Sequence, residues 1–183
     1  MSYKRWSFIA ILLFCIGLAI GLATPLSIAG LMSEEIAALE ELSRILVPFS
    51  FLTVILIFIK NVSALVVSFV LSPILCLAPI LSLTVNGWLL AFVSSAVVQE
   101  ESLGFLLAGL LPHGIFEIPA LIIGQAAALS FGTMAMLALF RRRRSLLLPS
   151  LKQNLRYLLV ALALLLPAAI IETYVTPLLL NKL

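Results

Sequence analysis

Charged residues are scarce in this chain of 183 residues: they make up 10% of it, whereas apolar residues make up 63%. A soluble domain is nearer half apolar and a quarter charged, so this chain has too few polar side chains to cover a surface that faces water. Several apolar runs approach or exceed the roughly 18–20 residues needed to cross a bilayer. The scarcity of charge therefore predicts a multi-pass membrane protein whose backbone polar groups are satisfied within helices.

The chain also lacks aspartate and has a single histidine, His113. A zinc protease of the H-E-x-x-H type needs two histidines, and a Ser-His-Asp triad needs an aspartate or a glutamate in its place. The sequence Gln99-Glu100-Glu101 is similar to the paired glutamates of intramembrane prenyl-protein proteases, but the further histidine motifs of those enzymes are absent. No phosphate loop or dinucleotide fingerprint occurs. These absences argue against an enzyme, and we expect no cofactor.

Cysteine is also rare, and both Cys15 and Cys76 lie in apolar runs, where a small buried hydrophobic role is typical. Lys4 and Arg5 precede the first apolar run, as they would in a signal peptide. That run, residues 6–23, is long for a signal core, and no clean cleavage site follows it. We therefore expect the first apolar run to be a retained transmembrane helix.

Apolar runs and their interruptions predict an all-α integral membrane protein with a single transmembrane domain and about five crossings. The crossings are expected at about residues 6–23, 45–59, 62–83, 112–140 and 155–180. Lys60-Asn61 is expected to separate the second crossing from the third. Ser33 as a helix cap, followed by carboxylates in the first turn, predicts an amphipathic helix on the outer surface over residues 33–44.

The middle of the chain is less regular. Residues 62–98 and 103–140 each form an apolar stretch of nearly forty residues, which is too long for one crossing and too short for two. Prolines and glycines interrupt both stretches. We therefore expect a broken segment over residues 84–111 that is re-entrant or lies at the membrane interface, because non-helical backbone at membrane depth is tolerated only inside protein or beside a wet cavity.

Basic and acidic residues fall on opposite sides of this layout. With the N-terminus in the cytoplasm, nine of the eleven basic residues lie inside: Lys4, Arg5, Lys60, Arg141, Arg142, Arg143, Arg144, Lys152 and Arg156. Six of the eight acidic residues lie outside, and the other two lie in the membrane. The positive-inside rule thus favours this orientation. The four consecutive arginines are then mainly a topology signal that also contacts anionic lipid, and the lack of a basic domain argues against nucleic-acid binding.

The stretch "LLPHGIFEIPALIIG", residues 110–124, places ionisable groups inside a predicted crossing. If its helix starts at Pro112, one helix face joins the titratable pair His113 and Glu117 to a strip of small residues. The small residues are Ala120, Gly124, Ala128 and Gly132. Small residues at this spacing let another helix approach closely, which would enclose the pair in protein and away from lipid.

Further polar residues are expected at a similar depth on three helices: Asn86, His113, Glu117 and Glu172, with Gln125 at the edge of the same face. Three interpretations remain open for this set. It is a structural polar network in which each group is paired, a proton- or ion-handling site, or a metal site. His113, Glu117 and Glu172 would supply the ligands of such a metal, although we expect no resident metal.

These residues also carry a family resemblance. The sequence resembles the stage II sporulation protein M family at Asn61, Asn86-Gly87, Pro112-His113-Gly114, Glu117, Pro119-Ala120, Gly124, Glu172 and Thr176-Pro177. The resemblance implies a polytopic inner-membrane protein with about five helices. It also implies a scaffold, since the sporulating member holds peptidoglycan-degrading partners during engulfment. Many relatives occur in organisms that never sporulate, and some are thought to act beside transport machinery.

We therefore expect a non-enzymatic multi-pass protein of the cell membrane that acts as a scaffold or assembly component. Its expected partners are the lipid bilayer, further copies of itself in a homodimer or larger assembly, and other membrane-associated proteins. The alternative is a small transporter or channel subunit in which the His/Glu site handles protons or metal ions. Broken helices that line binding sites motivate this alternative.

Overall fold

The computed structural model describes residues 3–26, 48–140, 145 and 147–182. Within these residues the chain is all-helical, and its elements are α1 (Tyr3–Ala23), α3 (Phe51–Leu71), α4 (Leu77–Glu100), α5 (Leu103–Phe140), α6 (Leu147–Tyr174) and α7 (Thr176–Leu180). Five spans are long and apolar enough to cross a membrane, with α6 and α7 counted as one. The predicted all-α fold with five helices long and apolar enough to cross a membrane is confirmed.

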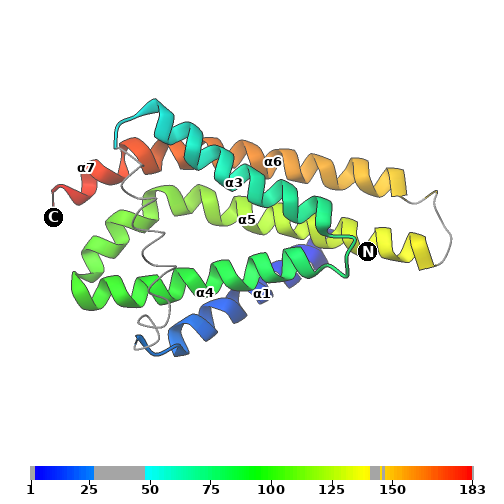
Figure 1. Cartoon of the computed structure of the whole chain (residues 1–183), viewed down its shortest axis with the longest axis horizontal. Helices are drawn as coiled ribbons and strands as arrows, with labels where there is room; N and C mark the ends of the chain where they lie inside the picture. Colours follow the sequence, from blue (N-terminus) through cyan, green and yellow to red (C-terminus); the bar gives the residue numbers. More distant parts are fainter. Residues whose placement is uncertain (1–2, 27–47, 141–144, 146, 183) are drawn as a thin grey trace.

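Helix α5 is the centre of the bundle and contacts each of the other described helices. In Figure 1 it runs between α1 and α4 on one side and α3 and α6 on the other. Two apolar clusters meet at α5. One joins it to α3 and α6 through Leu65, Phe69, Ala120, Ala127, Ala128, Leu158, Ala161 and Leu165. The other joins it to α1 and α4 through Trp6, Ala10, Phe14, Cys76, Leu83, Ala126 and Leu129.

Glycines bring α1 and α4 into backbone contact. A methyl group at Gly17 or Gly21 of α1 would collide with the carbonyl oxygen of Thr84 or Trp88 in α4. In the opposite direction, a methyl group at Gly87 would collide with the carbonyl oxygen of Phe14. Small residues spaced by four positions permit such close packing between transmembrane helices. The close packing of α1 against α4 therefore requires glycine at these three positions.

The boundary between the second and third crossings differs from the prediction. Helices were expected over 45–59 and 62–83, but α3 runs through Lys60 and Asn61 to Leu71, and α4 begins only at Leu77. Pro73 has no amide hydrogen to continue the helix, and the Ser72 hydroxyl bonds the carbonyl of Phe69 at 2.7 Å instead. The polar pair stays inside a helix because it has partners there: Asn61 donates to a carboxylate of α5.

The expected broken segment over residues 84–111 is also mostly helical. Helix α4 continues to Glu100, and α5 begins at Leu103 after a short turn. Figure 1 shows the first turns of α5 running at an angle to the rest of that helix. A kink is expected there because Pro112 lies inside α5 and removes one hydrogen bond. The depth of this kinked part in a bilayer stays a prediction.

The two ends of the bundle differ in charge, and Lys182 lies at the same end as the acidic residues. Lys4 and Arg5 begin α1, and the neighbouring Tyr3 stacks on Tyr157 of α6, next to Arg156, at 3.5 Å between ring centroids. The opposite end carries Glu100 and Glu101 in the α4–α5 turn. The basic end agrees with the predicted orientation, which itself stays a prediction, but Lys60, which was expected at the inner side, lies in the middle of α3. The predicted amphipathic segment 33–44 and the arginines 141–144 lie outside the described residues.

Candidate intramembrane polar site

Three ionisable side chains from two helices meet near one end of the bundle. One ligand-type atom from each of His113, Glu117 and Glu172 lies within 4.8 Å of the other two. His113 and Glu117 are four residues apart and share one face of α5, whereas Glu172 comes from the last turn of α6. The sequence placed the three at a similar depth, and the folded chain brings them into one group. We call these three residues the outer cluster.

Neighbouring side chains orient two members of the outer cluster. The Nδ1 atom of His113 lies 3.5 Å from the hydroxyl oxygen of Thr176, at the start of α7. Its Nε2 atom lies 3.9 Å from Oε2 of Glu117. The other carboxylate oxygen of Glu117, Oε1, accepts a hydrogen bond of 3.4 Å from the Asn61 amide of α3. Thr176 and Asn61 thus flank the pair, and Nε2 and Oε2 face one another.

The charges around Glu172 are of both signs. The Glu117 carboxylate and the Lys60 ammonium both act electrostatically on Glu172. Two carboxylates at this separation repel one another when both are ionised, and apolar surroundings strengthen that repulsion. A proton or a bound cation relieves it. The outer cluster is therefore suited chemically to holding positive charge.

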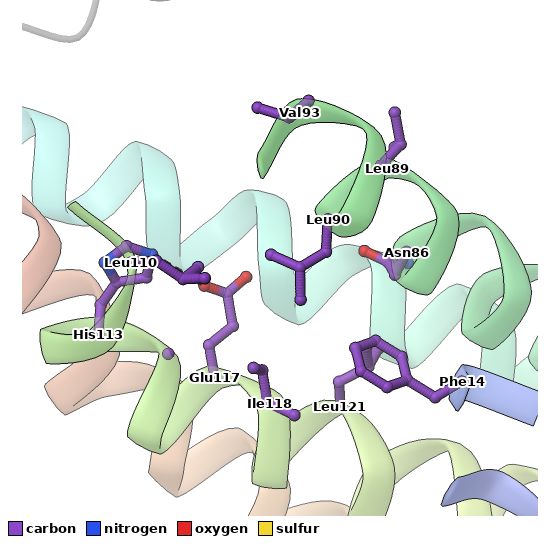
Figure 2. A pocket seen from close by; sticks show the side chains of 11 residues that line it. Phe14, Asn86, Leu89, Leu90, Val93, Leu110, His113, Glu117, Ile118 and Leu121 are labelled. Carbon is purple, nitrogen blue, oxygen red and sulfur yellow. Dashed lines mark ion pairs between the residues drawn. The ribbon is translucent and has the colours of Figure 1, made fainter. Parts of the chain in front are cut away.

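A cavity adjoins the outer cluster between α4 and α5. Its volume is about 280 Å³, and its lining includes His113, Glu117, Asn86 and the apolar side chains Phe14 and Leu90. Figure 2 shows Glu117 pointing from α5 into this space, with Leu90 and Asn86 of α4 across from it. The volume admits several water molecules or a hydrated ion. One wall of the space is thus ionisable while most of the remainder is apolar.

Gln125 belongs to a second, separate group of polar side chains. It is completely buried, and its Oε1 atom accepts a hydrogen bond of 2.6 Å from the Ser68 hydroxyl of α3. Its Nε2 atom donates to the Ser82 hydroxyl of α4 at 2.7 Å. We call Gln125, Ser68 and Ser82 the inner network. The predicted single network is therefore divided into two levels along α5.

Within the described residues, the Asn86 side chain makes no hydrogen bond to the outer cluster. Its amide donates to the backbone carbonyl of Ser82, one turn earlier in α4, at 2.7 Å. Together with Asn61, Ser82, Glu117 and Gln125 it lines a small cavity of about 50 Å³ between the two levels. Asn86 thus borders the space between the outer cluster and the inner network.

The predicted small-residue face of α5 is buried within the chain. Ala120 and Ala128 belong to the apolar cluster shared with α3 and α6. A methyl group added at Gly124 would lie 2.8 Å from Leu65 Cδ2 and 3.3 Å from Ala161 Cβ. At Gly132 it would collide with the carbonyl oxygen of Ser72. These residues bring α3 and α6 close to α5, so the face serves intramolecular packing.

Sequence reasoning did not assign four residues of these groups to the site. Asn61 and Thr176 appear in the family resemblance, which was the signal available for them. Ser68 and Ser82 carry no comparable signal, because a serine in an apolar helix usually bonds its own backbone. Only the fold reveals that both hydroxyls face the Gln125 amide.

The comparisons with known proteins agree with this picture of the chain. Residues 10–177 match the family described as Stage II sporulation protein M. An uncharacterized protein of Methanocaldococcus jannaschii is 32% identical over 103 residues, which cover 55% of this chain and 58% of that relative. The chain therefore spans little more than half the length of this curated relative. No solved structure matches the chain. Because the family match covers almost the whole sequence, the chain is a member of the Stage II sporulation protein M family.

Proposed function

We propose that this chain is a non-enzymatic scaffold or assembly component of the cell membrane that holds membrane-associated partners. The observation that carries the proposal is the rigid packing of the bundle. Helices α1 and α4 touch through glycines at backbone distance, and α5 meets the α3–α4 turn in the same way at Gly132. The inner network ties α3, α4 and α5 together with short hydrogen bonds.

Such packing favours a body of fixed shape over one that alternates between two shapes. A helix that slides must lose its close contacts and regain equivalent ones, which tight packing of glycine against backbone makes costly. A fixed body with apolar sides is suited to presenting defined surfaces to other proteins in the membrane. Membership of the family supports this proposal, because the resemblance implies a scaffold.

The outer faces of two helices are available to such partners. Phe8 and Leu22 on α1 are 68% and 69% exposed, and Phe51 and Val70 on α3 are 72% and 64% exposed. In a membrane these side chains contact either lipid or another helix, since lipid tails are as apolar as leucine. The partner is a second copy of the chain or another membrane-associated protein.

Photo-crosslinking in intact cells tests the proposal. A photoreactive residue is placed in turn at Phe8, Leu22, Phe51 and Val70, with Leu83, which is completely buried, as the matched control. We expect at least one exposed position to give a crosslink of constant mass to one protein, and Leu83 to give none. If every exposed position gave crosslinks to lipid alone, the scaffold proposal would be overturned.

A second candidate function is that of a small transporter or channel subunit that handles protons or metal ions. The specific observation in its favour is the outer cluster beside the 280 Å³ cavity. It is tested by proton and metal flux in proteoliposomes at equal incorporation. Glu117→Gln is expected to abolish a flux that Glu101→Gln, in the α4–α5 turn, leaves intact. Absence of flux from folded wild-type protein would reject this candidate.

A further inference from the structure

We propose that His113, Glu117 and Glu172 bind one divalent transition-metal cation. The proposal reverses the expectation from sequence that the protein holds no metal. It also does not depend on either function above, because a bound metal stabilises a scaffold as readily as it serves a transporter. Four features of the outer cluster support it: the placement of the ligands, their orientation by neighbouring residues, their charge, and access from a cavity.

The ligand atoms of the outer cluster lie close enough together to share one metal ion. One ligand atom from each of the three side chains lies within 4.8 Å of the other two, and His113 Nε2 and Glu117 Oε2 are 3.9 Å apart. Metal-bound nitrogen and oxygen atoms lie about 2.0–2.2 Å from zinc, so tetrahedral ligands are roughly 3.3–3.6 Å from one another. The ligand atoms therefore need to converge by about an ångström, within the rotamer freedom of two glutamates.

Orientation by neighbouring residues supports a built site. A metal-binding histidine usually engages its second ring nitrogen with a polar partner, and a metal-binding carboxylate is held in the same way. Thr176 takes this position at Nδ1 of His113, and Asn61 takes it at Oε1 of Glu117. The remaining atoms of the pair, Nε2 and Oε2, face one another, where a metal would bind.

Charge favours a divalent cation over an empty cluster. Two carboxylates and a neutral imidazole carry two negative charges, which are costly to bury among apolar helices. A divalent cation neutralises both at once. The side chains of the three residues are only partly buried, so the cluster remains accessible to an ion.

Access and residual coordination come from the cavity. His113 and Glu117 both line the 280 Å³ space between α4 and α5. A cation held by three protein ligands keeps at least one position for water, and this space accommodates that water. The site thus resembles an open metal centre, whereas structural zinc sites are closed by four protein ligands.

The ligand set indicates the class of metal. One imidazole nitrogen with two carboxylate oxygens suits zinc, manganese or ferrous iron. Magnesium and calcium prefer sites made of oxygen alone and are expected to bind far more weakly. The bound metal would connect α5 to the end of α6, next to α7.

The single histidine makes a direct test possible. The chain is purified without a polyhistidine tag, labelled with ¹⁵N-histidine and titrated with Zn²⁺ in nanodiscs. Because His113 is the only histidine in the sequence, every imidazole signal belongs to the site. We expect its ¹⁵N resonances to shift and to saturate at one equivalent of Zn²⁺, whereas Mg²⁺ at the same concentration leaves them unchanged.

Variants assign the carboxylates. Glu117→Gln and Glu172→Gln are each expected to weaken Zn²⁺ binding by at least about tenfold, in line with the loss of a metal ligand. Glu101→Gln, in the exposed turn before α5, is the matched control and is expected to bind as the wild type does. Unchanged imidazole signals in folded wild-type protein would overturn the proposal. Wild-type affinity for Zn²⁺ in both cluster variants, or binding of Mg²⁺ as strong as that of Zn²⁺, would do so as well, and none of these results bears on the crosslinking test.

Discussion

The two halves of α5 are packed in different ways. In the half that begins at Leu103, methyl groups added at Gly109 and Gly114 would meet their nearest neighbours at 3.8 Å. In the half that ends at Phe140, methyl groups at Gly124 and Gly132 would meet neighbours at less than 3.0 Å. The first half borders the 280 Å³ cavity, and the second is enclosed by α1, α3, α4 and α6.

The polar residues of the two halves differ in the same direction. Gln125, in the tight half, is completely buried and makes hydrogen bonds of 2.6 and 2.7 Å. Glu117, in the loose half, has contacts of 3.4 and 3.9 Å, and about a third of its side chain is exposed. Short bonds at both ends of a completely buried amide hold that amide in place and away from any ligand in the 280 Å³ cavity. Long contacts around a carboxylate leave lone pairs available, so the difference separates a structural group from a binding group.

The largest effect is expected from overpacking the tight half. Gly132→Ala places a methyl group against the backbone of Ser72, which cannot rotate away as a side chain can. We expect a loss of about 2–3 kcal/mol of unfolding free energy. Gly109→Ala is the matched control in the loose half, where a methyl group has room, and its effect is expected to be neutral or slightly stabilising. Unfolding in mixed micelles measures both, and equal losses would erase the difference between the halves.

A smaller loss is expected when the inner network is removed. Gln125→Leu abolishes the hydrogen bonds to Ser68 and Ser82. Hydrogen bonds between transmembrane helices contribute on average roughly 0.6 kcal/mol each, so we expect a loss of about 1–2 kcal/mol for the pair. A double-mutant cycle with Ser68→Ala isolates one bond. Additive losses in that cycle would contradict a coupling between the two side chains.

The sequence was sufficient for the architecture because apolar runs and the asymmetry of charge do not depend on contacts. It was insufficient for the α3–α4 boundary. Lys60-Asn61 looks like the end of a helix until its partner is known, and that partner, Glu117, is 56 residues away from Asn61 in the chain. Pro73 was the better signal for the break, since it removes a hydrogen bond from any helix that contains it.

The sequence identified the ionisable residues of the polar site but not all of their partners. Ionisable residues in apolar runs stand out, so His113, Glu117 and Glu172 were identified and do lie together. Gln125 also stood out, but its two serine partners did not, so the prediction grouped it with the outer residues and without Ser68 and Ser82. Depth along a helix is readable from sequence, whereas the pairing of faces is decided by the packing of several helices together.

Glu117→Gln is expected to change stability much less than Gln125→Leu does. The amide keeps the size of the side chain, can still accept from Asn61, and removes a charge from an apolar environment. We expect a change within about 0.5 kcal/mol, because the long contacts of Glu117 contribute little to folding. Unfolding in mixed micelles compares it with Gln125→Leu. A loss as large as that of Gln125→Leu would make Glu117 a structural residue and would break the contrast between the halves.

No change in stability is expected from Glu101→Cys, which instead tests where the loose half of α5 lies. Glu101 is exposed in the turn between α4 and α5, at the acidic end of the bundle. With Cys15 and Cys76 replaced by alanine, we expect an impermeant maleimide to label this position from outside intact cells. Labelling only after permeabilisation would indicate the opposite membrane orientation and would contradict the positive-inside rule. Labelling from outside would instead place the kinked part of α5 at the outer side of the membrane, and the cavity of the outer cluster would then adjoin the side from which an external cation arrives.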